Sequence, residues 1–144
     1  MKKTFANADY FKVVSRFLAQ GKCVRLRVQG ESMSPFFPNG SLVSLRPATA
    51  SQLRRGVPVL ARTDGDVYVF HRILRITDDT AVLQGDGNLR GTESARLDQV
   101  FGAARCGRLE RTAALLWQRM LPVRRYLLGI WRLKRRIFSG ASRR

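Results

Sequence analysis

The central part of this chain alternates short apolar segments with residues that interrupt regular structure. In "CVRLRVQG", residues 23–30, Val24, Leu26 and Val28 alternate with mostly polar side chains, and "SLVSLRP", residues 41–47, ends in a proline. A period of two is typical of half-buried strands, and glycine, proline and Asp-Gly pairs mark the turns between strands. These segments predict a mainly β domain built from short strands.

The same alternation continues toward the C-terminus. "VPVLARTDGDVYVFHRILRI", residues 57–76, is expected to form two strands joined at the Asp64-Gly65 turn. "TAVLQGDGN", residues 80–88, adds a strand that ends in a corner rich in glycine and aspartate, and residues 95–110 contain one or two more strands. The predicted β region therefore extends to the part of the chain that is strongly basic.

Near both ends of the chain, apolar residues recur at helical spacing. Residues 7–20 show this spacing, and Gly21 is a natural stop. From about Thr112, large apolar residues alternate with arginines, and Pro122 is expected to kink or split this helix. The expected organisation is an N-terminal helix in residues 1–21, a β domain in 22–110 and a basic amphipathic helical tail in 111–144.

The net charge of +17 is concentrated in the tail, where residues 105–144 hold 12 lysines and arginines and one acid, Glu110. Such a segment is expected to meet phosphate groups. Trp117, Tyr126 and Trp131 among the arginines are typical of a helix that lies in a membrane surface, so we expect an anionic membrane as partner, with nucleic acid less favoured. A core-packing helix with a solvated basic face is the alternative.

Composition excludes several classes of protein. An apolar fraction of 44% argues against disorder, and Cys23 and Cys106 are too few for a disulfide scaffold. With one histidine and no CxxC spacing, we expect neither a metal nor another cofactor. The sequence holds no spanning segment of about 18 apolar residues and no secretory signal, which predicts a cytoplasmic protein, peripheral at the inner face of the membrane.

The segment "GESMSPFFPNG", residues 30–40, is expected to be a loop, because prolines remove hydrogen-bond donors and glycines favour bends. It carries Ser32 and three large apolar residues, Met33, Phe36 and Phe37. These apolar side chains either pack in the core or line a groove for substrate or membrane. The loop itself is either a cap on the core or a rigid support for a nucleophile.

Ser32, the lone histidine His71 and Asp86 each follow or end a predicted strand. These are the residue types of nucleophilic acyl chemistry, because a serine hydroxyl needs a base to take its proton and a carboxylate can hold that base in one tautomer. Residue types alone are weak grounds, since a histidine on a strand is more often structural than catalytic.

The order of three motifs strengthens this interpretation. "GESMSPFFPNGSLVSLRP", "VYVFHRIL" and "LQGDGN" together resemble the type I signal peptidases, specifically the branch that uses serine and histidine. That family has a Ser-Met-x-Pro loop, a His-Arg pair on a later strand and a Gly-Asp-x-Asn corner. The self-cleaving repressors of the SOS and phage type share its fold and serine loop. The resemblance covers about residues 22–104 and implies a signal peptidase-like β domain.

By this resemblance Ser32 is the nucleophile, His71 the general base and Asp86 a carboxylate that supports it. Arg72 and Asn88 match the motifs and are expected to be structural. The Ser32 N–H is one expected oxyanion donor.

The sequence departs from the family at two positions near the site. Gly30 stands where many bacterial relatives have a serine, so a second oxyanion donor is not identified. The serine-histidine branch carries a second acid after the Gly-Asp-x-Asn corner, and here Glu93 and Asp98 are both candidates out of register.

Lysines occur only at positions 2, 3, 12, 22 and 134, so none lies between the serine loop and the Gly-Asp corner. A serine-lysine pair, as in the repressors, would require Lys22 or Lys134 to fold back. The leading hypothesis is a serine endopeptidase that removes a leader or signal segment from a precursor. The alternatives are a self-cleaving repressor-type domain and a non-enzymatic basic adaptor that binds membrane or nucleic acid.

Overall fold

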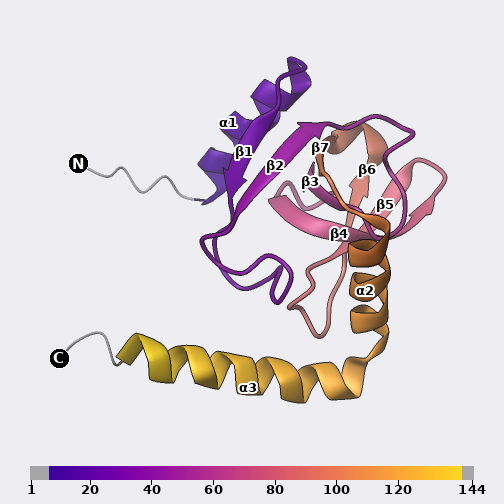
Figure 1. The fold of residues 1–144 in the computed structure, drawn as a ribbon. Coiled ribbons are helices and arrows are strands. Elements are labelled where there is room, and N and C mark those ends of the chain that lie inside the picture. Colours follow the sequence, from indigo (N-terminus) through magenta and orange to yellow (C-terminus); the bar gives the residue numbers. More distant parts are fainter. Residues whose placement is uncertain (1–6, 141–144) are drawn as a thin grey trace, which may run out of the picture.

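In the part of the chain that the structure describes, seven strands form an antiparallel sheet that curls around the core (Figure 1). The computed structural model describes residues 7–140, so residues 1–6 of the predicted N-terminal helix and 141–144 of the predicted tail lie outside the described residues. Neighbouring strands follow the order β1-β2-β7-β3-β4-β5-β6. Their bounds are β1 Val24–Arg27, β2 Leu42–Pro47, β3 Pro58–Arg62, β4 Tyr68–Thr77, β5 Thr80–Gln84, β6 Glu93–Arg96 and β7 Val100–Ala104.

The strands follow the predicted alternation, and the mainly β fold is confirmed. β3 and β4 are joined at the predicted Asp64-Gly65 turn, where Thr63 N donates to Val67 O at 2.8 Å. The segment expected to hold one or two strands contains β7 and the second half of β6, separated by a short 3₁₀ helix at Leu97–Gln99. β4 is the longest strand, with ten residues, and it carries His71 between its partners β3 and β5.

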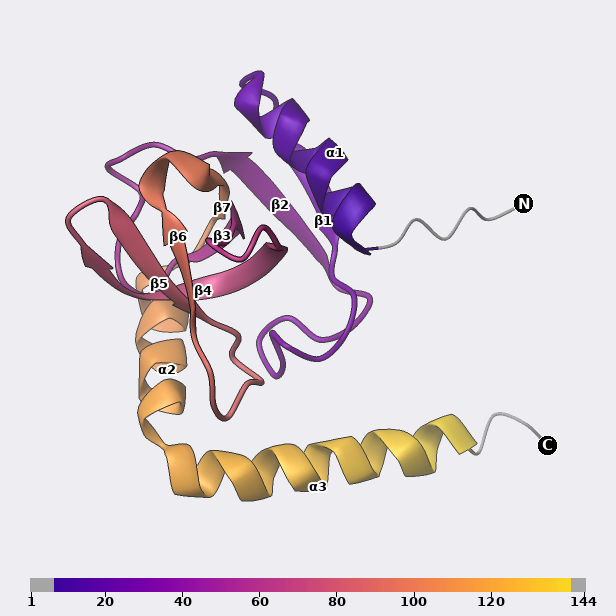
Figure 2. The ribbon, with the colours of Figure 1, turned by 180° about the vertical axis from the view of Figure 1, so that it is seen from behind.

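The helix α1, Asn7–Ala19, packs against the sheet at β7 (Figure 2). Its Val14 and Leu18 are buried. A Cβ added at Gly102 of β7 would lie 2.6 Å from a Leu18 methyl carbon, so the glycine allows the helix to approach. Gly21 has a φ of +80° and ends the helix as predicted.

The buried apolar side chains form two clusters. One joins α1, β1, β2 and the serine loop, and the other lies mainly between β3, β4, β5 and β7. Large members of the first cluster are Leu18, Leu26, Met33, Leu45, Leu60 and Phe70, and large members of the second are Val59, Ile73, Leu83 and Val100.

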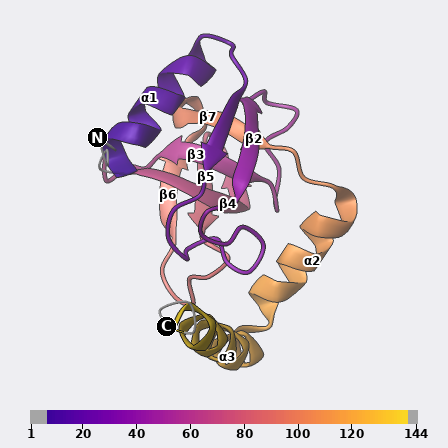
Figure 3. The same cartoon turned by 60° about the vertical axis from the view of Figure 1, so that its left-hand side comes forward.

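Two helices follow the sheet, α2 at Arg108–Arg119 and α3 at Leu121–Gly140. The break at Met120 agrees with the split expected near Pro122. α3 runs beneath one end of the sheet and is seen nearly end-on in Figure 3. It is anchored there by buried Arg124 and Leu128, and the Arg124 guanidinium donates a hydrogen bond to the carbonyl of Asn88.

None of the helices within residues 7–140 combines the length and the apolar character needed to cross a bilayer.

Candidate active site

The loop that carries Ser32 is closed at its base by backbone hydrogen bonds. Val28 N donates to Ser41 O and Gly40 N donates to Val28 O, both at 2.8 Å. Gly30 has a φ of +82°, and its N–H donates to the Asn39 side-chain oxygen at 3.0 Å. Because glycine reaches this conformation without steric cost, the chain turns sharply two residues before the serine.

Apolar side chains hold the serine loop against the core. Met33 is 1% exposed, and Phe37 N donates to Met33 O at 2.8 Å. The Phe37 ring meets Phe70 edge-on, with centroids 5.6 Å apart. The Arg72 guanidinium lies over both phenylalanine rings, 5.3 Å from the centroid of Phe36 and 5.8 Å from that of Phe37. Met33 is thus buried in the core, Phe37 is half-buried against the core, and Phe36 is half-buried beside Arg72.

The Gly85-Asp86-Gly87 corner contacts the backbone of the serine directly. Gly87 N donates to Ser32 O at 2.8 Å. A Cβ at Gly85 would lie 2.2 Å from Ser32 O, and one at Gly87 would lie 2.3 Å from Glu31 O. Only glycine fits at these two positions without moving a backbone, so the corner determines where the Ser32 peptide lies.

Ser32 and His71 line the same cavity, which has a volume of about 170 Å³. They come from segments 39 positions apart, the serine loop and the middle of β4. His71 is 6% exposed, so its ring is held among buried groups. The rest of the lining is mainly apolar: Phe11, Leu26, Val28, Gln29, Met33, Tyr68, Val69 and Phe70.

The carboxylate that contacts His71 is Glu93, the first residue of β6. The distance from His71 Nδ1 to Glu93 Oε2 is 3.0 Å, and the Glu93 side chain is 34% exposed. This contact leaves Nε2 as the ring nitrogen available to a hydroxyl group. Asp98, the other acid considered from the sequence, forms an exposed ion pair with Arg96 at 3.2 Å.

Asp86, which was expected to support His71, forms its side-chain hydrogen bonds with Arg72. Its side chain is fully buried, and its two oxygens accept hydrogen bonds from Arg72 Nε at 2.8 Å and Nη2 at 2.7 Å. Burial raises the pKa of the Asp86 carboxyl, and the hydrogen bonds from Arg72 oppose this rise. The Asp86 carbonyl also accepts a hydrogen bond from Trp117 Nε1 at 2.8 Å. Asp86 thus joins β4, the glycine corner and α2.

Among the described residues, the lysines lie outside the Ser32 cavity. The Lys22 ammonium sits 5.1 Å from the centroid of the Phe17 ring, at the end of α1. Lys12 and Lys134 are exposed, and neither lines the cavity. Lys2 and Lys3 lie outside the described residues. Within the described chain, His71 is the titratable base that shares the cavity with Ser32.

The sequence matches the family described as Peptidase S24-like over residues 2–93, which is more than half of the chain. The matched range ends at Glu93 and includes Ser32, His71 and Asp86. No curated protein and no solved structure is significantly similar to this chain.

Proposed function

The chain belongs to the Peptidase S24-like family, and from this premise we propose that it is a serine endopeptidase that cleaves a leader or signal segment from a protein or peptide precursor. One observation carries the proposal: Ser32 and His71 line one cavity, and Glu93 contacts the far ring nitrogen of His71. Nucleophile, base and orienting carboxylate are thereby all present at one place.

The proposed reaction follows from these roles. Ser32 Oγ attacks the scissile carbonyl carbon while His71 Nε2 takes the hydroxyl proton. His71 then gives this proton to the leaving amine, and an acyl ester remains on Ser32. A water molecule then attacks the ester carbonyl carbon while His71 takes its proton, and His71 returns this proton to Ser32 Oγ as the bond to the acyl group breaks. Glu93 accepts a hydrogen bond from His71 Nδ1–H, which holds the reactive tautomer and stabilises the imidazolium that forms in each step.

The cavity beside Ser32 supports a preference for apolar substrate side chains. Its volume of about 170 Å³ and its mainly apolar lining suit one small or medium-sized apolar group. We expect cleavage of an unbiased peptide library to yield cut sites enriched in such residues next to the scissile bond, as read by mass spectrometry. Cut sites enriched in charged residues at that place would contradict the expectation.

Self-cleavage of the repressor type is the competing activity in this family. Incubation of the pure protein at mildly alkaline pH, followed by mass spectrometry of the intact chain, separates the two activities. An intact chain that still cuts library peptides supports cleavage of a separate substrate, whereas self-cut fragments without peptide cleavage would overturn it.

Glu93 is a positioning residue in this proposal, and Glu93→Gln is expected to lower kcat about 10- to 100-fold with a smaller change in KM. The amide keeps the shape of the side chain but no longer stabilises a charged His71. Because a general structural defect would not lower kcat selectively, kcat and KM are measured separately. Asp98→Asn is the matched control, since Asp98 pairs with Arg96 on the surface and should leave kcat within about twofold. Equal losses in both variants would contradict the role of Glu93.

We also propose that α3 docks this peptidase on an anionic membrane surface. Exposed apolar side chains recur along the helix at i, i+3, i+4, i+7 and i+10, starting at Val123, and we call this row of side chains the α3 stripe. Arg125 and Arg132 are exposed on the same helix. Arg124 and Leu128 of this helix are buried, whereas the residues of the stripe are 43–75% exposed. An apolar stripe flanked by arginines suits a helix in the plane of a membrane. The stripe consists of Val123, Tyr126, Leu127, Ile130 and Leu133.

The position of α3 in the fold agrees with docking of this helix on a membrane. The serine loop and the loop between β5 and β6 extend from the same end of the sheet, on the side where α3 lies (Figures 1 and 2). A membrane bound by α3 would therefore lie near the mouth of the peptidase site.

Membrane docking predicts that Leu127→Glu with Ile130→Glu weakens binding to vesicles of phosphatidylcholine and phosphatidylglycerol at least about tenfold, because two apolar side chains can no longer enter the acyl boundary. Co-sedimentation measures the binding. Leu42→Glu with Val67→Glu changes two similarly exposed apolar residues on the β domain and serves as the control. Unchanged binding in the α3 variant would show that the tail is not the docking element.

A further inference from the structure

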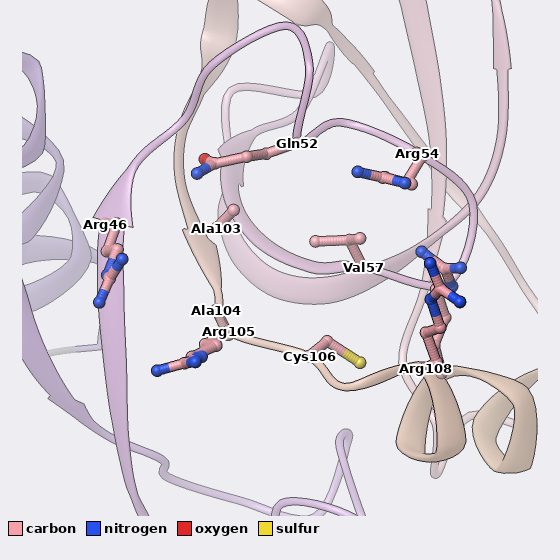
Figure 4. Close-up of a pocket in the computed structure, with 10 residues that line it drawn as sticks. Arg46, Gln52, Arg54, Val57, Ala103, Ala104, Arg105, Cys106 and Arg108 are labelled. Atoms are coloured by element: carbon pink, nitrogen blue, oxygen red, sulfur yellow. The ribbon is translucent and has the colours of Figure 1, made fainter.

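A second cavity lies away from Ser32 and is surrounded by arginines (Figure 4). It has a volume of about 450 Å³, within the range of small-molecule sites, and it shares no lining residue with the Ser32 cavity. Its walls come from β2, the loop between β2 and β3, the end of β7 and the start of α2. We call this cavity the arginine pocket, after Arg46, Arg54, Arg105, Arg108 and Arg111.

No acidic side chain lines the arginine pocket. Among the described residues, none of the five guanidinium groups forms an ion pair with a carboxylate. Arg54 donates to the carbonyl of Ser51 at 3.3 Å. Glu110 lies beside Cys106, whose thiol pKa is raised by burial and by that carboxylate. Five cations in one lining give the pocket a positive potential, which attracts an anion.

Two further features favour an anion. α2 starts at the pocket with Gly107 as its N-cap, which provides no side-chain cap, so the first N–H groups of the helix add positive potential. The Arg111 stem is held over Gly56, where an added Cβ would lie 2.3 Å from Arg111 Cγ. In Figure 4, Arg46 and Arg105 lie on one side of the cavity and Arg54 and Arg108 on the other. The guanidinium groups thus come from separate elements around one space.

From this arrangement we propose that the arginine pocket binds a phosphate-bearing ligand with at least two negative charges. Guanidinium groups pair with phosphate oxygens through two parallel hydrogen bonds, and several such groups match an ester or pyrophosphate better than a single carboxylate. The same chemistry is offered by a soluble phosphate ester and by a lipid with a phosphomonoester headgroup.

The test measures binding of inorganic pyrophosphate to the full chain by calorimetry at fixed ionic strength. It also measures co-sedimentation with phosphatidylcholine vesicles that contain either phosphatidic acid or phosphatidylserine. The pocket variant combines Arg46→Gln, Arg105→Gln and Arg108→Gln. Its control combines Arg16→Gln, Arg25→Gln and Arg75→Gln, which remove the same charge from exposed positions outside the pocket.

We expect the affinity of the pocket variant for its phosphate probe to fall at least about tenfold for each substituted arginine that contacts the phosphate. The affinity of the control variant should stay within about twofold of the wild type. Selective loss of pyrophosphate binding identifies a soluble ligand, and selective loss on phosphatidic acid vesicles alone identifies a lipid headgroup. Equal losses in both variants, or no binding of either probe by the wild type, would overturn the proposal. If the wild type binds single-stranded DNA but neither pyrophosphate nor phosphatidic acid vesicles, the proposal is wrong and the arginines form a nucleic-acid surface.

The two cysteines provide a measurement on the unmutated protein. Cys106 lines the arginine pocket and Cys23 is exposed elsewhere, so bound pyrophosphate or phosphatidic acid should slow the reaction of Cys106 with a neutral maleimide and leave Cys23 unchanged. Mass spectrometry resolves the two sites. An unchanged Cys106 rate under saturating probe would count against the proposed site.

Discussion

Ser32→Ala is expected to lower precursor cleavage by at least about 10³-fold while the protein stays folded, because it removes the attacking oxygen. Cleavage is followed by mass spectrometry, and thermal melting monitors the fold. The matched control is Ser34→Ala in the same loop. Ser34 Oγ donates to Glu31 Oε2 at 2.7 Å and does not line the Ser32 cavity, so its loss should affect stability more than the reaction.

His71→Ala should cause a loss of similar size, because the serine hydroxyl then has no base in the cavity. The double variant Ser32→Ala with His71→Ala should be no slower than either single variant, since the two groups act as a unit. Cleavage retained by Ser32→Ala would exclude the proposed nucleophile. Additive losses would mean that serine and histidine act independently.

Asp86→Ala is expected to lower the free energy of unfolding by about 3–5 kcal/mol, since it leaves the buried Arg72 guanidinium without its charged partner. For a domain of this size the melting temperature should fall by about 10 °C. Trp117 fluorescence is a useful probe of the unfolding transition, because its indole N–H donates to the Asp86 carbonyl and reports on the contact of α2 with the corner.

Two comparisons show whether the buried pair causes this effect. Asp98→Ala breaks an ion pair whose side chains are 59–61% exposed, and it should cost less than about 1 kcal/mol. Arg72→Met added to Asp86→Ala should recover part of the lost stability, because it removes the unpaired buried charge. Equal costs for Asp86→Ala and Asp98→Ala would refute the structural role assigned to Asp86.

Most strands could be predicted because burial of one sheet face imposes alternation directly on the sequence. The start of α2 was predicted less accurately than the strands. The helix begins at Arg108, four residues before the expected Thr112, because its first turn holds one apolar residue, the exposed Leu109, among charged ones. A single apolar residue sets no helical spacing that a sequence pattern could detect.

The partner of His71 could not be chosen from the sequence. Asp86 belongs to the recognised Gly-Asp-x-Asn corner and was the acid expected at His71, while Glu93 and Asp98 are further acids after that corner. The pairing of Leu83 with Glu93 in β5 and β6 brings one of them to the histidine, and this depends on strand register. The arginine pocket could not be predicted from the sequence either, because its arginines are spread between positions 46 and 111 and no local motif connects them.

The amino-acid sequence alone is enough to predict the mainly β fold, the position of the serine loop and the lack of a lysine between that loop and the glycine corner, because these depend on alternation, on glycine and proline, and on residue types present or absent in a stretch. Only the tertiary structure decided which carboxylate meets His71, that Asp86 neutralises a buried arginine, and that five arginines share one cavity. These are contacts between segments distant along the chain, and their geometry is set by how the strands pair and how the helices pack.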